Sequence, residues 1–151
     1  MRRIALVATL CLAPLAAAPL GGCAHNAATS LPSKKPLYER LGGKGAITAV
    51  VDSFVGLVGS DERINARFIN ADIPHLKAML VEQICAASGG PCTYTGKDMK
   101  TVHAGMNITD DEFNALVDDL QKTMEHFKVA ADAQKDLIGA LAPMKPQIVG
   151  Q

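Results

Sequence analysis

The chain has 151 residues, which allows one domain, or one domain with appendages. Its 15 lysines and arginines balance 15 aspartates and glutamates, and this neutral charge argues against a nucleic-acid binder that works by bulk positive charge. Hydrophobic residues make up 48% of the chain but aromatic residues only 4%, and tryptophan is absent, so aliphatic side chains must fill most of any core.

The first 22 residues have the layout of an export signal. Arg2 and Arg3 precede an uncharged apolar stretch over residues 4–20, as in a secretory signal. Leu20-Gly21-Gly22-Cys23 resembles the bacterial lipobox, in which the cysteine thiol takes a diacylglycerol. The alternatives are an ordinary signal cleaved after Ala16-Ala17-Ala18 and a retained membrane anchor. We expect a lipoprotein signal over residues 1–22, with a lipid on Cys23 that holds the exported protein in the periplasm or at the outer membrane of a bacterium.

The segment after the signal separates it from the folded domain. Residues 23–36 are rich in alanine, serine, proline and lysine and are predicted to form a flexible tether. A single domain is expected over residues 37–151, which is long enough for one core. Removal of the signal takes away two arginines and no acid, which leaves 13 basic and 15 acidic residues and a charge of −2.

Helical periodicity runs through the first half of this domain. A short helical turn is predicted at 37–41, and apolar residues at spacings of three and four predict a helix from about 44 to 59. Asp72-Ile73-Pro74 is typical of a helix start, with the aspartate as cap and the proline in the first turn. This helix is predicted to end at Gly89-Gly90-Pro91, and its inward face is expected to hold Leu76, Leu80, Gln83 and Ile84.

The second half is also helical but has a long loop. Residues 89–98 are predicted to be loop, followed by a short helix at 99–104 that Gly105 stops. Thr109-Asp110-Asp111-Glu112 is typical of a capping box, and a helical apolar stripe follows it. A last helix is expected from about 132 to 141, ended by Pro143. No alternating run of β-branched residues competes, so the predicted fold class is all-α.

Two cysteines of the expected domain could pair with each other. Cys85 and Cys92 are separated by six residues that include two glycines and a proline. Outside the cytosol such a pair can be oxidised to a disulfide, and the alternative is two free thiols that do not reach bonding geometry. A metal site on this pair is not expected, because no histidine or second cysteine pair has a suitable spacing.

Common enzyme motifs are absent from the sequence: there is no G-x-S-x-G, H-E-x-x-H, P-loop or Rossmann glycine pattern. Helix capping accounts for the acidic run at 110–112, and Asp118 and Asp119 are expected on a solvated helix face. His103 lies between Gly96 and Gly105 among methionine and aliphatic residues, where an imidazole is either a structural group or a haem ligand.

Two motifs carry a resemblance to a known family. They are Leu37-Tyr38-Glu39-Arg40-Leu41-Gly42-Gly43 and Gly89-Gly90-Pro91-x-x-Tyr94-Thr95-Gly96-x-x-Met99-Lys100-x-Val102-His103-x-Gly105-x-x-Ile108-Thr109. Both resemble the truncated haemoglobins, which are short two-over-two globins, and group I of that family best. The resemblance covers about residues 37–142. It implies an all-α, truncated two-over-two globin fold with haem b as the cofactor.

The resemblance also implies which residues meet the haem. His103 matches the proximal histidine, whose ring nitrogen binds the iron, and Phe68 matches the phenylalanine that packs on the haem. The other positions expected at the haem are Phe54, Val55, Leu76, Met79, Leu80, Tyr94, Met99, Val102 and Ile108.

The distal side of the haem, opposite the proximal histidine, departs from the family pattern. Val55 stands where members of this group often have a tyrosine, and Leu76 and Leu80 stand where they often have glutamine or another donor. Gln83 lies one turn further along the same helix. A hydrogen bond to bound dioxygen contributes about 1.5–3 kcal/mol, so we expect weak oxygen retention and less penalty for carbon monoxide.

The sixth position of the iron has two candidate internal ligands. Met79 lies where some relatives carry a basic residue, and a thioether can bind haem iron. His75 is the other candidate, one position away from the expected face. The alternative is that Met79 packs against its neighbours and His75 is solvated.

The resemblance implies a haem protein that reversibly binds diatomic gases such as oxygen, nitric oxide and carbon monoxide through the iron held by His103. Gas binding or oxygen transport without catalysis is the favoured reading, and nitric oxide dioxygenation or electron transfer with an unidentified reductant is left open. The alternative from another class is a helical envelope lipoprotein that binds a protein partner and has lost haem. Neither hypothesis involves nucleic acid.

Overall fold

Helices account for nearly all regular structure in residues 34–151, the part of the chain that the computed structural model describes. Within these residues the only β pairing is an isolated parallel bridge between Ile108 and Val149, so the predicted all-α class is confirmed. The predicted signal, the lipid site at Cys23 and most of the predicted tether lie outside the described residues. No helix of residues 34–151 is long and apolar enough to cross a membrane.

The first two helices meet at a glycine turn. Helix α1 (Leu37–Arg40) is followed by Gly42, whose φ of 87° lies in the left-handed region that glycine adopts without strain. The backbone N–H of Lys44 donates to the Tyr38 hydroxyl at 3.0 Å, which ties the start of α2 (Gly43–Val58) to α1. Helix α2 is the centre of the core and buries Ile47, Val50, Val51, Phe54, Val55 and Val58.

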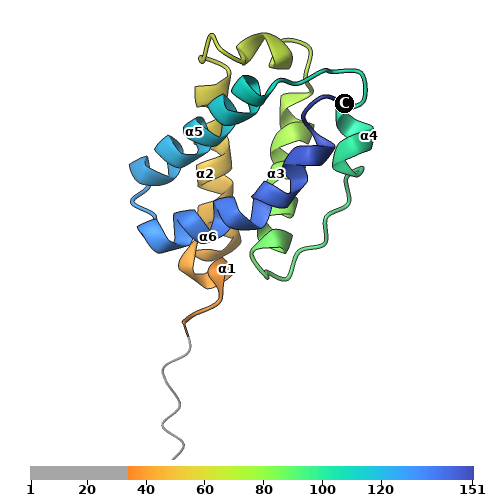
Figure 1. The fold of residues 1–151 in the computed structure, drawn as a ribbon. Coiled ribbons are helices and arrows are strands. Elements are labelled where there is room, and N and C mark those ends of the chain that lie inside the picture. The colour runs from red at the N-terminus through yellow and green to blue at the C-terminus, as the bar shows by residue number, and fades with distance from the viewer. Residues whose placement is uncertain (1–33) are drawn as a thin grey trace, which may run out of the picture. The chain divides into compact units, whose positions relative to one another are not determined.

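Helix α3 (Ile73–Ala87) packs against α2 and begins as predicted (Figure 1). The Asp72 carboxylate accepts a hydrogen bond from the backbone N–H of His75 at 3.1 Å, which satisfies one free donor of the first turn. The predicted inward face divides in two. Ile84 lies in the core together with Val81 and Cys85, whereas Leu76, Leu80 and Gln83 are half-buried and line a cavity.

A loop connects α3 to the short helix α4 (Met99–His103). Cys85, which is fully buried, forms a disulfide with Cys92 of this loop, with the two Cα atoms 5.7 Å apart. The loop is held a second time by Glu82, whose carboxylate accepts hydrogen bonds from the N–H and the hydroxyl of Thr95 at 2.9 and 2.8 Å. The disulfide and the hydrogen bonds of Glu82 thus both hold the segment that leads to His103.

Helix α5 (Asp110–His126) packs on α2, and the last α-helix contacts α1, α3 and α5. Helix α5 begins with the predicted capping box, in which the Thr109 and Glu112 side chains each accept from the other residue's backbone N–H. Helix α6 (Ala131–Leu141) continues into a 3-10 helix, η2 (Ala142–Gln147), and a further 3-10 helix, η1 (Asn65–Phe68), precedes α3. In Figure 1, α5 crosses α2, and the two helices pack together.

The expectation that Asp118 and Asp119 both lie on a solvated face is wrong for Asp119. Its side chain is only 1% exposed, and one of its carboxylate oxygens has no hydrogen-bond partner in the described part of the chain. Burial, followed by the charge of Asp61, raises the pKa of Asp119. Arg63 and Lys122 lie 3.6 and 3.4 Å from its other oxygen. The helical stripe predicts apolar neighbours correctly, but a carboxylate occupies one of the inward positions.

Candidate functional site

A cavity of about 560 Å³ lies between α3 and α4, with α2 and α5 also contributing to its wall. This volume is within the range of small-molecule and cofactor sites, about 300–1,000 Å³. The cavity is lined by every residue expected at the haem except Ile108, namely Phe54, Val55, Phe68, Leu76, Met79, Leu80, Tyr94, Met99, Val102 and His103. Ile108 lines a smaller cavity of about 90 Å³, which shares Phe68, His103, Leu116 and Ile148 with the large one.

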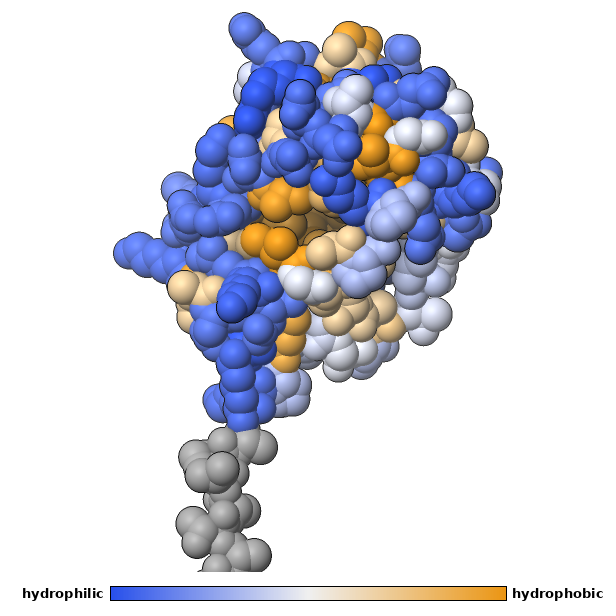
Figure 2. All heavy atoms as spheres, in the orientation of Figure 1, coloured by the Kyte–Doolittle hydropathy of each residue, from blue (hydrophilic) through white to orange (hydrophobic). Residues whose placement is uncertain are grey.

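Apolar groups dominate these walls. Figure 2 shows one face of the molecule, on which hydrophilic side chains surround a central hollow with apolar sides. Val55 is 8% exposed and Phe54 is 4% exposed, so the α2 wall, which also includes Val58, is the most buried part of the cavity lining. Val102 is 46% exposed and lies at the rim of the cavity. A site of this kind favours a large apolar ligand that has one polar edge.

His103 is the last residue of α4 and is half-buried in the cavity wall. Its Nδ1 lies 2.8 Å from the backbone carbonyl oxygen of Met99, one helical turn earlier. A carbonyl oxygen can only accept, so this contact assigns the proton to Nδ1 and leaves Nε2 with a free lone pair. A histidine held in this way has a fixed ring orientation and one nitrogen available as a metal ligand.

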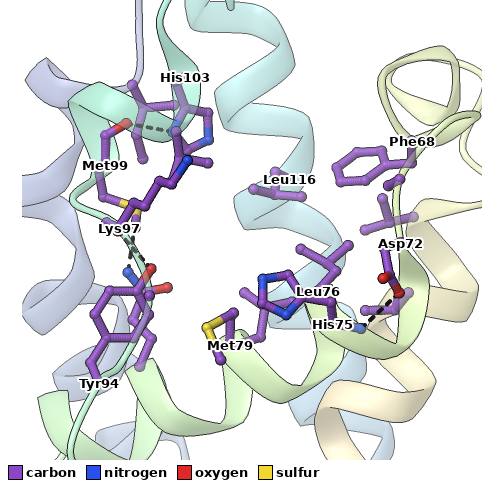
Figure 3. A pocket seen from close by; sticks show the side chains of 18 of the residues that line it. Phe68, Asp72, His75, Leu76, Met79, Tyr94, Lys97, Met99, His103 and Leu116 are labelled. Carbon is purple, nitrogen blue, oxygen red and sulfur yellow. Dashed lines mark hydrogen bonds between the residues drawn. The ribbon is translucent and has the colours of Figure 1, made fainter.

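Helix α3 presents its own side chains across the cavity from His103 (Figure 3). Leu76 and Leu80 line the cavity with Met79, and all three are half-buried. His75, which the sequence pattern places one position off this face, also lines the cavity while remaining exposed at its mouth. The structure therefore brings both proposed sixth ligands, His75 and Met79, into the wall that faces His103.

Most other polar groups of the wall already have protein partners. Gln83 Nε2 lies 3.5 Å from the Met99 sulfur and 3.2 Å from the Met144 sulfur, so this amide donates to thioethers. The Tyr94 hydroxyl donates to the Lys97 carbonyl oxygen at 2.9 Å, and burial is the main cause that raises the pKa of Tyr94. Gln83 and Tyr94 of the wall thus already donate within the protein.

The smaller cavity adjoins an ion pair that joins three segments. The Arg67 guanidinium of η1 donates to both oxygens of Glu112 at 2.7 and 3.0 Å and to the Met106 carbonyl oxygen at 2.8 Å. The Arg67 hydrogen bond, followed by the backbone N–H of Thr109, lowers the pKa of Glu112 to about 2. Arg67 therefore connects η1, the start of α5 and the turn that follows His103.

Several lining residues were not predicted. Leu116 belongs to the apolar stripe of α5 and so carried a sequence signal, whereas Lys97 stands at an unspecified position of the glycine-bounded motif. Ala71, Asp72 and Thr101 were not expected to line the cavity, although the structure places all three in its wall. Ile148 follows the prolines that end the last helix, and nothing in its local sequence indicates a place in the cavity.

The donor set of the cavity fits a haem. One imidazole offers a free ring nitrogen from a wall that is otherwise lined mainly by aliphatic, aromatic and thioether side chains. Such a wall suits the flat apolar macrocycle, and the imidazole suits its iron. Residues 34–151 contain no group of three or more histidine, cysteine, aspartate or glutamate side chains that could hold a metal ion without such a cofactor.

Comparisons with known proteins give the same result. Residues 36–149 match the family model described as bacterial-like globin. The chain is 36% identical over 112 residues to the group 1 truncated hemoglobin GlbN of Mycolicibacterium paratuberculosis, covering 74% of this chain and 82% of that protein. It is 32% identical to the group 1 truncated hemoglobin of Tetrahymena pyriformis, covering 68% and 94% of the two chains. The crystal structure of the Tetrahymena pyriformis protein in its Fe(III) form superposes with a TM-score of 0.74 at 30% identity, covering 76% and 98% of the chains.

Proposed function

Because the chain belongs to the bacterial-like globin family, whose members bind haem, we propose that it is an exported globin that binds haem through His103 and releases oxygen rapidly. When bound, haem b supplies an iron that binds a diatomic gas. The observation that carries the assignment is the His103 ring, which is held by the Met99 carbonyl oxygen with Nε2 left free beside an apolar cavity.

The residues around this ring have separate tasks. Met99 orients the imidazole through its backbone, so the ring does not have to be ordered when the cofactor enters. Phe68 and Leu116 supply apolar surface that packs on a flat ligand. Val55 and Phe54 supply an apolar inner wall that offers water no hydrogen-bonding group.

The distal wall determines how long a gas molecule stays. Val55, Leu76 and Leu80 have no hydrogen-bonding groups in their side chains, and the Gln83 amide donates to two sulfur atoms instead. Oxygen, which is stabilised by a donor more than carbon monoxide is, should therefore leave fast. This distal wall is poorly suited to a dioxygenase cycle, which requires oxygen to be retained until nitric oxide arrives.

The position of His75 and Met79 supports a second state of the same site, in which one of these side chains is the sixth ligand of the iron. Both lie on the wall across from His103, and a side chain that reached the iron would compete with a gas. A thioether ligand would also raise the potential of the iron and favour electron transfer with a reductant. The absorption spectrum of the ferrous protein separates the two states, because a six-coordinate low-spin form and a five-coordinate high-spin form absorb differently.

Export is proposed from the sequence. The arginine pair and apolar stretch of residues 1–22, the lipobox-like Leu20-Gly21-Gly22-Cys23 and the disulfide between Cys85 and Cys92 all favour a compartment outside the cytosol. We propose a periplasmic or outer-membrane lipoprotein anchored through Cys23.

Hemin titration tests the haem assignment. The purified protein is expected to take up one equivalent of hemin with a strong Soret band, and His103→Ala should bind hemin at least tenfold more weakly with a changed spectrum, because the iron loses its protein ligand. His126→Ala, which alters an exposed histidine on α5, is the matched control.

The same titration, repeated after reduction with dithionite, reports the coordination number. A Soret band that is unchanged in His103→Ala would refute the proximal assignment. The absence of any band in the unaltered protein would favour the alternative, a helical lipoprotein that has lost haem and binds a protein partner.

A further inference from the structure

Residues 142–151, here called the C-terminal strap, return from the end of α6 to the segment that carries His103. The strap begins with η2, which packs against α4, and in Figure 1 the C-terminus lies beside α4. Lys145 of the strap forms an ion pair with Asp110 at 2.6 Å and lies over the Phe113 ring at 5.2 Å from its centre. These contacts fix η2 to the start of α5.

The end of the strap pairs with the turn that follows α4. The Asn107 N–H donates to the Gln151 carbonyl oxygen at 2.7 Å, and the Gly150 N–H donates to the Ile108 carbonyl oxygen at 2.9 Å. Gly150 has a φ of 71°, a conformation that suits glycine. Backbone hydrogen bonds thus hold residues 107 and 108, which lie four and five residues after His103.

The side chains of the strap reach the cavity itself. Ile148 lines both the large cavity and the adjoining small one, and His103 lines the same two cavities. Met144 accepts a hydrogen bond from Gln83 of α3 at 3.2 Å. The strap therefore touches the walls on both sides of the cavity, the one with His103 and the one with α3.

We infer that the C-terminal strap is part of the haem-binding site: Ile148 forms its wall next to His103, and the pairing of residues 150–151 with 107–108 is the positioning element for that histidine. The inference rests on the proposed function, because it takes His103 as the iron ligand. Without the strap the small cavity would lose the Ile148 part of its wall, and residues 107 and 108 would lose their backbone partners.

Two variants test the two parts of the inference. Ile148→Ala removes apolar surface from the wall and should raise the rate of hemin loss to an excess of apomyoglobin roughly tenfold. Gly150→Pro removes the donor to Ile108 and cannot adopt the observed φ, so it should shift the iron–histidine stretching band in the resonance Raman spectrum of the ferrous protein. A purely structural role for the strap would leave that band unchanged.

Ile138→Ala is the matched control, since Ile138 is a half-buried isoleucine of α6 that lines neither of these two cavities. It should lower the unfolding temperature but leave hemin loss and the Raman band unchanged. The inference is overturned if Ile148→Ala loses hemin within twofold of the unaltered rate, and this result decides the question even if Gly150→Pro does not fold. If the unaltered protein takes up no hemin, the proposed function fails and the inference with it; if only the strap variants lack an effect, the inference alone fails.

Discussion

Val55 is the residue whose chemistry most directly limits oxygen retention. Its side chain is 8% exposed and lines the cavity from α2, where it can pack but cannot donate a hydrogen bond. The Gln83 amide, which lines the same cavity, already donates to the sulfur atoms of Met99 and Met144. Gas retention in this site is therefore a property of single side chains, because one hydroxyl at the right place would add the missing donor.

We expect Val55→Tyr to slow oxygen release by roughly ten- to a hundredfold, the effect of one added hydrogen bond to a polarised acceptor. Carbon monoxide release should change much less. Stopped-flow measurement of both off-rates tests this, and Val55→Phe, which adds the same ring without the hydroxyl, is the control. Slow oxygen release in the unaltered protein that persists in Gln83→Leu would contradict this view of the distal wall.

At the scale of the elements, the ion pair between Arg67 and Glu112 links the segments around the small cavity. Glu112 caps the start of α5 and binds Arg67 of η1, which also holds the Met106 carbonyl oxygen after α4. The pKa of Glu112 is lowered to about 2, whereas an unfolded glutamate has a pKa of about 4.3. A carboxylate with a lowered pKa stabilises the fold above its unfolded pKa, and this stability is lost as the pH falls toward 2.

Arg67→Met should lower the urea midpoint of the apoprotein at pH 7, and the difference from the unaltered protein should shrink as the pH falls from about 4.3 toward 2. Part of the difference should remain, because the hydrogen bond to Met106 does not depend on pH. Lys77→Met breaks a pair with the exposed Asp52 and should have little effect at any pH. A difference for Arg67→Met that stays constant down to pH 2 would show that Glu112 is not the titrating partner.

At the scale of the whole molecule, the disulfide relates the fold to the compartment. The Cys85–Cys92 bond closes a short loop between α3 and the segment that leads to His103. A bond of this kind stabilises a protein mainly by restricting the unfolded chain, and for so short a loop the expected gain is about 2–3 kcal/mol. That gain is available only where the thiols are oxidised, which agrees with the proposed export.

Expression of the full chain in a bacterium should therefore give a protein with no free thiol at Cys85 and Cys92 and with a fatty-acid label that Cys23→Ala abolishes. A chain that starts at residue 24 and stays in the cytosol should carry both thiols reduced and unfold at lower urea. Alkylation followed by mass spectrometry, together with labelled palmitate, measures both properties. Reduced thiols and no label in the full-length protein would argue against export as a lipoprotein.

Much of the fold follows from local sequence. The caps at Asp72 and Thr109 and the apolar stripe of α2 depend on residues at most one or two turns apart, so their patterns predict the helices directly. The motif around His103, which contains α4 and the loop before it, indicated the site through its resemblance to the truncated haemoglobins and not through local spacing. Periodicity fails at Asp119, because spacing tells which face of a helix is inward but not how a carboxylate on that face is tolerated.

The sequence by itself determined the all-α class, the helix boundaries within a few residues and the histidine that faces the cavity, because these depend on short-range spacing and on a long specific motif. Only the tertiary structure decided that Ile148 lies beside His103, that Gln83 donates to Met99 and Met144, and that His75 reaches the cavity mouth. The contact between Gln83 and Met144, for example, joins residues that are 61 positions apart in the sequence. The physical reason is that packing between distant segments depends on how the helices cross, which no local pattern encodes.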